Sequence, residues 1–334
     1  MTVPRLLITA WPHLADRDTT PHIMWTVNLS LVPIIAAAIY YFGPSAALVL
    51  AAAVAGCVLT ERLFGVAGSL WDGSALITGL LLGLCLPAGL PLWMAFIGGV
   101  FAIGIGKLIF GGLGQNVFNP ALLGRAFLQA AFPVALTTWP ALGSDWWHLR
   151  GDNFALPLMS ARTVDVVTAA TPLGLWKFEG RGTEIGRLLL GATGGSLGET
   201  ASVVIVVCGA YLAWRRYLNW RIPAGILGTV ALLSSGLHLV DAVRFPGPLF
   251  MLFSGGLMLG AVYMATDLVT SPVTNLGSWV FAAGVGALVV VIRIWGGLAE
   301  GVMYAILIMN ALVPFINRAT QPRVFGTRAR AGGP

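Results

Sequence analysis

Long apolar stretches alternate with short polar ones along almost the whole chain. About 20 mainly apolar residues cross a bilayer as a helix, because the backbone must satisfy its own hydrogen bonds in lipid. We therefore expect an all-α integral membrane protein with about ten transmembrane segments, five on each side of one long polar interval. Their approximate ranges are Met24–Tyr41, Ala46–Leu63, Ser74–Leu86, Leu92–Phe110, Pro120–Val134, Leu197–Trp214, Pro223–Leu239, Leu249–Ala265, Trp279–Ile294 and Leu298–Ile316.

The same pattern divides the chain into five parts. Two five-helix halves, 23–134 and 197–317, flank a polar loop at 135–196. A short segment, 1–22, precedes the first half, and a basic tail, 318–334, follows the second.

Composition agrees with a membrane protein. Hydrophobic residues make up 57% of the chain and charged residues 10%, whereas soluble proteins carry roughly 25% charged residues. A soluble globule is therefore excluded, and the lipid bilayer is the expected environment. The net charge of +6 does not indicate nucleic-acid binding, because the basic residues fall at helix ends rather than in one patch.

Cysteine and histidine usage limits the possible cofactors. The 3 cysteines lie far apart, each inside an apolar run, which supports neither a disulfide framework nor a cysteine-ligated cluster. Of the 4 histidines only His238 approaches a membrane segment, so haem held between helical histidines lacks ligands. We expect no metal site, and any redox cofactor should be organic.

The distribution of basic residues predicts the orientation. Cytoplasmic loops carry an excess of Lys and Arg, whereas long loops cross the membrane largely regardless of charge. With the N-terminus inside, only Arg244 and Arg293 fall on the outer face among the cations outside the 135–196 loop. We predict a multi-pass protein of the cell (inner) membrane with both termini cytoplasmic and the 135–196 loop outside.

A short repeat suggests that the two halves are related. Gly111-Gly112-Leu113-Gly114-Gln115 and Gly296-Gly297-Leu298-Ala299-Glu300 each precede the last helix of a half. Five predicted spans separate the two copies, an odd number, so the halves would be inverted repeats.

The third segment of each half is interrupted. Ser74–Leu86 is entered through Asp72-Gly73, and Leu249–Ala265 contains Ser254-Gly255-Gly256 and runs into Asp267. Paired broken segments are typical of a binding site near the bilayer midplane, and acids at such places are functional candidates. Asp72 and Asp267 are therefore candidates for an ion path, although both would also serve as ordinary helix-end acids.

Hydroxyls, an acid and small residues gather in the loop that joins the halves. The stretch Arg162–Gly174 contains Asp165, Thr168, Ala170 and Thr171. Threonine, aspartate and proline favour turns without any function, so this stretch by itself also fits a plain surface loop.

Six ordered motifs carry a resemblance. The chain is similar to the RnfD family, the flavin-bearing membrane subunits of Rnf-type ion-translocating ferredoxin:NAD oxidoreductases. That family is related to the corresponding membrane subunit of the sodium-translocating NADH:quinone reductase. The resemblance runs from about Thr20 to Gly326, through the motifs Asp72–Gly79, Gln115–Ala121, Val164–Pro172, Gly194–Thr200, Met264–Thr274 and Glu300–Ala305.

The resemblance implies a covalent flavin in the loop. In the family, the threonine that ends a D-x-x-[ST]-x-A-T pattern carries FMN as a phosphoester, attached by a separate flavin transferase. Here that threonine is Thr171, with Asp165, Thr168 and Ala170 at the matching upstream positions. An acid such as Asp165 could hold the divalent metal that accompanies a pyrophosphate donor.

The resemblance also implies a place in a larger assembly. The chain would relay electrons, one at a time, within a multi-subunit membrane complex that couples ferredoxin and NAD chemistry to Na⁺ or H⁺ transport. We expect it to be incomplete as a catalyst alone. Some relatives hold a second, non-covalent flavin within the helices, and no motif here assigns one. Further candidates for that flavin or for the ion path are Asn116, Asn119, Glu199 and Thr270.

Three of these candidates also have a plain structural interpretation. Asn116 and Asn119 lie where Pro120 would start a helix, and Glu199 is favoured in the first turn of the sixth segment. Two other functions fit as well: the related subunit of a sodium-translocating quinone reductase, and a solute channel or transporter with inverted repeats and no redox role. Only the flavin-attachment pattern argues against the transporter.

Overall fold

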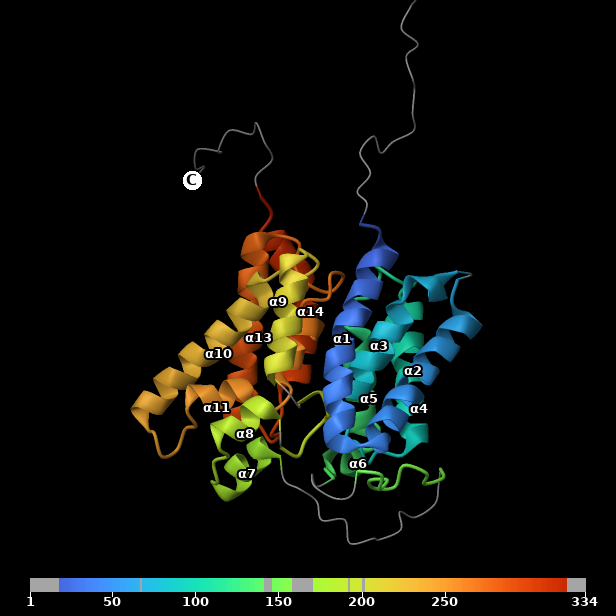
Figure 1. Ribbon diagram of the computed structural model, residues 1–334. Coiled ribbons are helices and arrows are strands. Elements are labelled where there is room, and N and C mark those ends of the chain that lie inside the picture. The colour runs from blue at the N-terminus through green and yellow to red at the C-terminus, as the bar shows by residue number, and fades with distance from the viewer. Residues whose placement is uncertain are drawn as a thin grey trace, which may run out of the picture.

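The computed structural model describes residues 18–66, 68–140, 146–157, 171–191, 193–199 and 202–322 (Figure 1). Helices form all the regular structure in these residues, and no strand occurs there. The described chain begins at α1 and ends after α14 at one end of the helical bundle, and α6, α7 and α8 lie at the opposite end (Figure 1).

The first half follows the predicted order closely. Its helices are α1 (Thr20–Phe42), α2 (Pro44–Phe64), a 3₁₀ turn η1 (Ser69–Asp72), α3 (Ser74–Leu84), α4 (Leu92–Ile103), a π-helical turn η2 (Gly104–Leu108), α5 (Pro120–Ala131) and α6 (Pro133–Thr137). Pro133 ends α5 earlier than predicted, because the residue before a proline avoids the helical conformation.

The second half is built in the same order. Its helices are α9 (Ser202–Trp214), α10 (Arg221–Val240), α11 (Pro248–Phe253), α12 (Leu257–Leu259) with a π-helical turn η4 (Gly260–Met264), α13 (Asn275–Trp295) and α14 (Val302–Ala319). The connection before it holds α7 (Pro172–Glu179), α8 (Ile185–Leu190) and a 3₁₀ turn η3 (Leu197–Glu199). The sixth predicted segment therefore starts as η3, and its regular helix begins only at Ser202.

Five helices of the described residues are long and apolar enough to cross a membrane, namely α1, α2, α10, α13 and α14. Three shorter apolar helices cover Ser74–Leu84, Leu92–Leu108 and Ser202–Trp214. These findings identify a helical membrane protein by length and composition, while the number of ten crossings stays a prediction.

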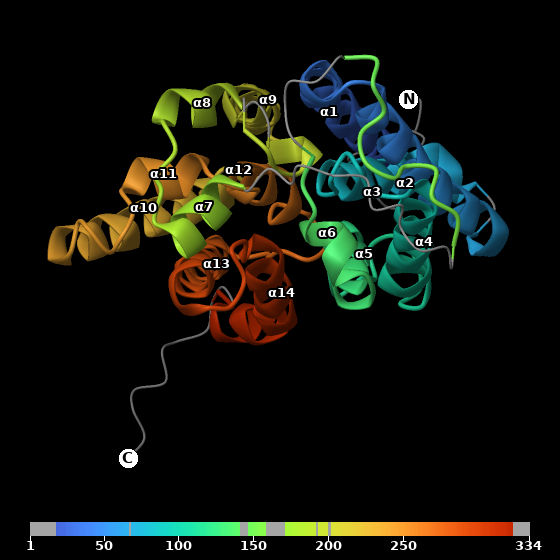
Figure 2. The same ribbon diagram turned by 90° about the horizontal axis from the view of Figure 1, so that it is seen from below.

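Equivalent helices of the two halves make equivalent contacts. In the first half α2 packs against α3 and α4, and α4 packs against α5. In the second half α10 packs against α11 and α13, and α13 packs against α14. Seen along the bundle, α1 to α6 lie on one side and α9 to α14 on the other (Figure 2).

Two cations at the ends of equivalent helices are buried. Lys107, just beyond α4, is 3% exposed, and its Nζ donates to Oε1 of Glu61 and to Oγ of Ser74, both at 2.6 Å. Arg293, in the last turn of α13, is 0% exposed and lies 3.2 Å from Glu300. Neither cation contributes a free charge to the protein surface, so the predicted orientation depends on the other basic residues.

Candidate functional site

A pocket with about 630 Å³ of empty volume lies beside Thr171. We call it the Thr171 pocket. Both halves and the connection between them contribute to its wall. The residues used below are Arg125 and Gln129 from α5, Thr137 from α6, Leu173 from α7, Glu199, and the run Leu298–Glu300 before α14.

Thr171 is fixed at the start of a helix. It is the N-cap of α7, and its Oγ1 accepts a hydrogen bond of 3.1 Å from the backbone N–H of Gly174. Threonine is a favoured N-cap residue, and Pro172 suits the first helical position. The hydroxyl is therefore held at the pocket wall on a half-buried residue. The other members of the predicted attachment pattern, Asp165, Thr168 and Ala170, lie outside the described residues.

Lys177 ties α7 to the second half. Its Nζ donates to the backbone carbonyls of Arg293, Gly296 and Leu298 at 2.9, 2.5 and 2.8 Å. These carbonyls end α13, where a cation is favoured by the helix dipole. Partial burial lowers the pKa of Lys177 from its ordinary value, so we expect the contact to weaken at a lower alkaline pH than for an exposed lysine.

A break in the third helix of the second half lies next to this anchor. Between α11 and α12, Arg293 donates to the carbonyls of Met251 and Ser254 at 2.6 and 2.9 Å. Glu300 accepts from the N–H of Gly256 at 3.0 Å. Gly255 has φ +67°, and a Cβ there would collide with Glu300 and with Leu173 of α7. The ion pair of Arg293 and Glu300 therefore stabilises the break, and Glu300 also lines the Thr171 pocket.

Among the described residues, three charged side chains line the Thr171 pocket: Arg125, Glu199 and Glu300. Oε1 of Glu199 accepts from the Ser196 hydroxyl at 2.8 Å. Glu199 was a sequence candidate, whereas Arg125 was not. Glu300 stood in a recognised motif without an assigned role. Nothing in the sequence pattern could have placed Arg125 opposite Thr171, because the two residues come from different helices far apart in the chain.

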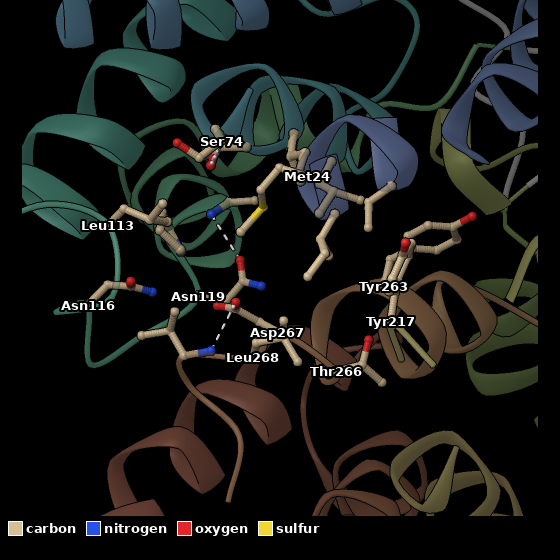
Figure 3. Close-up of a pocket in the computed structure, with 18 of the residues that line it drawn as sticks. Met24, Ser74, Leu113, Asn116, Asn119, Tyr217, Tyr263, Thr266, Asp267 and Leu268 are labelled. Carbon is tan, nitrogen blue, oxygen red and sulfur yellow. Dashed lines mark hydrogen bonds between the residues drawn. The ribbon is translucent and has the colours of Figure 1, made fainter. Parts of the chain in front are cut away.

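A second pocket lies on the other side of the bundle, between α1, α3 and the segment that follows η4. We call it the Asp267 pocket; its empty volume is about 850 Å³. Asn116, Asn119 and Asp267, predicted from separate motifs, meet there, and Tyr217 and Tyr263 line another part of the wall (Figure 3).

Hydrogen bonds connect the two halves at this second pocket. Asn119 caps α5 and donates to the carbonyl of Met264 at 3.1 Å. Asp267 accepts from the hydroxyl of Thr270 at 3.2 Å and from the N–H of Val269 at 3.4 Å. Thr270 does not line the Asp267 pocket itself, but its hydroxyl binds Asp267, which does. Asn116 lies on the wall of the same pocket.

Asp72 does not line either pocket. It accepts hydrogen bonds from the N–H and the hydroxyl of Ser74, at 2.8 and 2.5 Å, and so fixes the start of α3. Ser74 does line the Asp267 pocket, as does Lys107, which donates to it. Sequence reasoning missed the buried ion pair of Lys107 and Glu61. Its only signal in the sequence is Glu61 itself, an acid in the last turn of an apolar segment.

The repeated Gly-Gly-Leu motif occupies equivalent places in the two pockets. Leu113 lines the Asp267 pocket and Leu298 lines the Thr171 pocket. Each pocket is thus built on the connection before the last helix of one half.

These features define the class: a helical membrane protein with two pockets between its halves and a threonine hydroxyl at one of them. The sequence model of the NQR2, RnfD, RnfE family matches residues 7–326, and the chain belongs to this family.

Three relatives illustrate the family. The chain is 41% identical, over 96% of each chain, to a subunit of the proton-translocating ferredoxin:NAD(+) oxidoreductase complex of Clostridium ljungdahlii. It is 38% identical to a subunit of the Na(+)-translocating ferredoxin:NAD(+) oxidoreductase complex of Acetobacterium woodii, over 96% of this chain and 95% of the relative. It is also 42% identical, over 94% of each chain, to a subunit of the ion-translocating oxidoreductase complex of Stutzerimonas stutzeri.

These comparisons confirm the resemblance to the RnfD family. The family description also includes NQR2, but two of the relatives above are named as parts of ferredoxin:NAD(+) oxidoreductases, and all three match over almost their whole length. Their names place them in oxidoreductase complexes, which argues against the interpretation as a non-redox transporter.

We predict that Lys177→Met loosens α7. The change removes three hydrogen bonds of a charged donor, each of which contributes about 1.5–3 kcal/mol to stability. The loss of about 1.4 kcal/mol is enough to raise the equilibrium constant for local opening of α7 about tenfold. An arginine-specific protease acting on the purified protein should then cut faster after Arg181, whose side chain is 78% exposed. Glu179→Gln removes only a surface ion pair of 3.6 Å and is the control. Equal cleavage rates in both variants would contradict the anchoring role.

Proposed function

We propose that this chain is the membrane subunit of an ion-translocating oxidoreductase complex and passes electrons through FMN bound to Thr171. The observation that carries the proposal is a half-buried threonine hydroxyl at a pocket between the two halves. Relatives named as subunits of ferredoxin:NAD(+) oxidoreductase complexes support it, as does the attachment pattern that ends at Thr171.

The residues of the Thr171 pocket fit FMN. A phosphoester on Oγ1 of Thr171 would lie at the N-terminus of α7, where the helix dipole favours negative charge. The pocket wall combines apolar side chains such as Leu173 and Leu298 with a few polar groups, as is common at cofactor sites. Bound FMN supplies one-electron chemistry, and the protein holds its phosphate and shields its ring from water. A flavin transferase would make the attachment.

The Asp267 pocket is suited to the second, non-covalent flavin. Its wall is mainly apolar and includes two tyrosines, with the amide of Asn116 and the carboxylate of Asp267 as orienting polar groups. Such a lining is typical of sites for planar organic cofactors. Electrons would pass between the two pockets and on to partner subunits of the complex, whose flavins and iron–sulfur centres complete the path between ferredoxin and NAD.

The proposal includes ten crossings in two inverted halves, with both termini cytoplasmic. Support comes from the equivalent contacts of equivalent helices. It also comes from the position of α7 and α8 at the end of the bundle opposite to the starts and ends of the described chain (Figure 1). The Thr171 pocket would then face outward and the Asp267 pocket inward.

We predict that Thr171→Ala abolishes flavin attachment, because the acceptor hydroxyl is lost. Wild-type protein, denatured and run on a gel, should fluoresce like flavin, and the variant should not. Thr137→Ala is the matched control, since Thr137 lines the same pocket but bonds only to carbonyls of its own helix. Fluorescence that survives in Thr171→Ala would refute this attachment site.

We predict that Phe178→Cys reacts with a membrane-impermeant thiol reagent added outside intact cells, because Phe178 is 73% exposed on α7. Gln321→Cys, at the other end of the bundle, should react only after permeabilisation. The three native cysteines are buried and should give a low background. The opposite pattern would reverse the orientation.

We predict that Asp267→Asn lowers the ratio of ions moved to ferredoxin oxidised at least twofold in vesicles that contain the whole complex. The acid lines a pocket within the bundle, where a carboxylate persists only with a partner or a function. Asp72→Asn is the comparison, because Asp72 fixes the start of α3 and lines neither the Thr171 pocket nor the Asp267 pocket. If both variants kept the wild-type ratio with normal assembly, the ion path would lie elsewhere.

A further inference from the structure

Arg125 is a buried cation whose donors are not all used. It lies on α5, is 9% exposed, and lines the Thr171 pocket. Its Nε has no hydrogen-bond partner, and no ion pair within 4.0 Å among the described residues includes it. The thiol of Cys85 is a side-chain neighbour, but thiol sulfur is a weak acceptor. The charges of Glu199 and Glu300 also act on Arg125, but neither acid forms an ion pair with it within 4.0 Å, so a ligand in the pocket can still accept hydrogen bonds from its guanidinium.

The two acids of the pocket already have partners. Glu300 pairs with Arg293 and accepts from Gly256, and Glu199 accepts from Ser196. The other buried cations of the described residues are Lys107, Arg150 and Arg293, and each donates from its side chain to at least one oxygen. The Nε atoms of Arg150 and Arg293 lack a partner, as that of Arg125 does, so the difference lies in the other donors of the guanidinium. The remaining donors of Arg125 are therefore left for a ligand in the pocket.

We propose that Arg125 places its guanidinium against the N1–C2=O edge of the flavin ring carried by Thr171, and so sets the potential of that flavin. This proposal rests on the proposed attachment of FMN. The phosphate is bound to Oγ1 of Thr171 and meets the N-terminus of α7, so the ring is the part that extends into the pocket. Arginine presents several planar donors to such an edge and keeps its charge.

The positive charge of Arg125 would favour reduction of the flavin ring. Bound FMN would take up one electron from a redox partner. Arg125 would then hold a fixed positive charge beside the ring that gains the negative charge, without any proton transfer. In a water-poor pocket, such a fixed charge acts more strongly than it would in solvent.

The first test is a redox titration of the purified, flavin-bearing full chain. Arg125→Met should lower the equilibrium constant of one-electron reduction at least tenfold, which is about 59 mV toward negative potential. Arg125→Lys, which keeps the charge but loses the planar donors, should shift it less. Gln129→Met, a neutral change one turn away in the same pocket, should leave the potential unchanged. Gel fluorescence of the wild type, read first, tests attachment separately.

The second test uses stability without activity. In the flavin-free Thr171→Ala protein, Arg125→Met should lower Tm less than in the flavin-bearing protein, because only the flavin-bearing protein also loses the contact between the guanidinium and the flavin. Equal changes of Tm in both backgrounds would overturn the proposal, and so would an unchanged potential in Arg125→Met. Loss of attachment in Arg125→Met together with an unchanged potential in Arg125→Lys would assign Arg125 to the phosphate or to folding, and would also overturn it.

Discussion

The break between α11 and α12 imposes the constraint on which the candidate site depends. The break is buried, with Met251 and Ser254 0% exposed, and buried backbone groups that lose their helical partners must find others. Arg293 binds the carbonyls of Met251 and Ser254, and Glu300 binds the N–H of Gly256. The two side chains also bond to each other, so the cost of burying each charge is offset by its partner and by the backbone.

The contacts around this break also fix the position of Thr171. Leu173, two residues after Thr171, packs against the break beside Gly255, and Lys177 donates to the carbonyls of Arg293 and Gly296. The helix that starts at Thr171 is therefore attached to the second half, by one apolar and one charged contact. The first half supplies the facing wall of the pocket through α5 and α6, so the pocket forms only where the halves meet.

The sequence predicted the long helices well because their length is set by the bilayer. The segment expected at Pro223–Leu239 is a helix at Arg221–Val240, and the interruption at Ser254–Gly256 is present. Asn116, Asn119 and Asp267 were found from separate motifs and share one pocket. Arg125 and the pair of Lys107 with Glu61 were not found. A single charge in an apolar segment shows that a partner is needed, but the pattern does not show which distant residue supplies it.

Both pockets combine residues of the two halves, and this limits how the halves can move. Glu300 lines the Thr171 pocket and also holds the break, while Asn119 caps α5 and binds the end of the same third helix at Met264. A shift of that helix would change the lining of both pockets together.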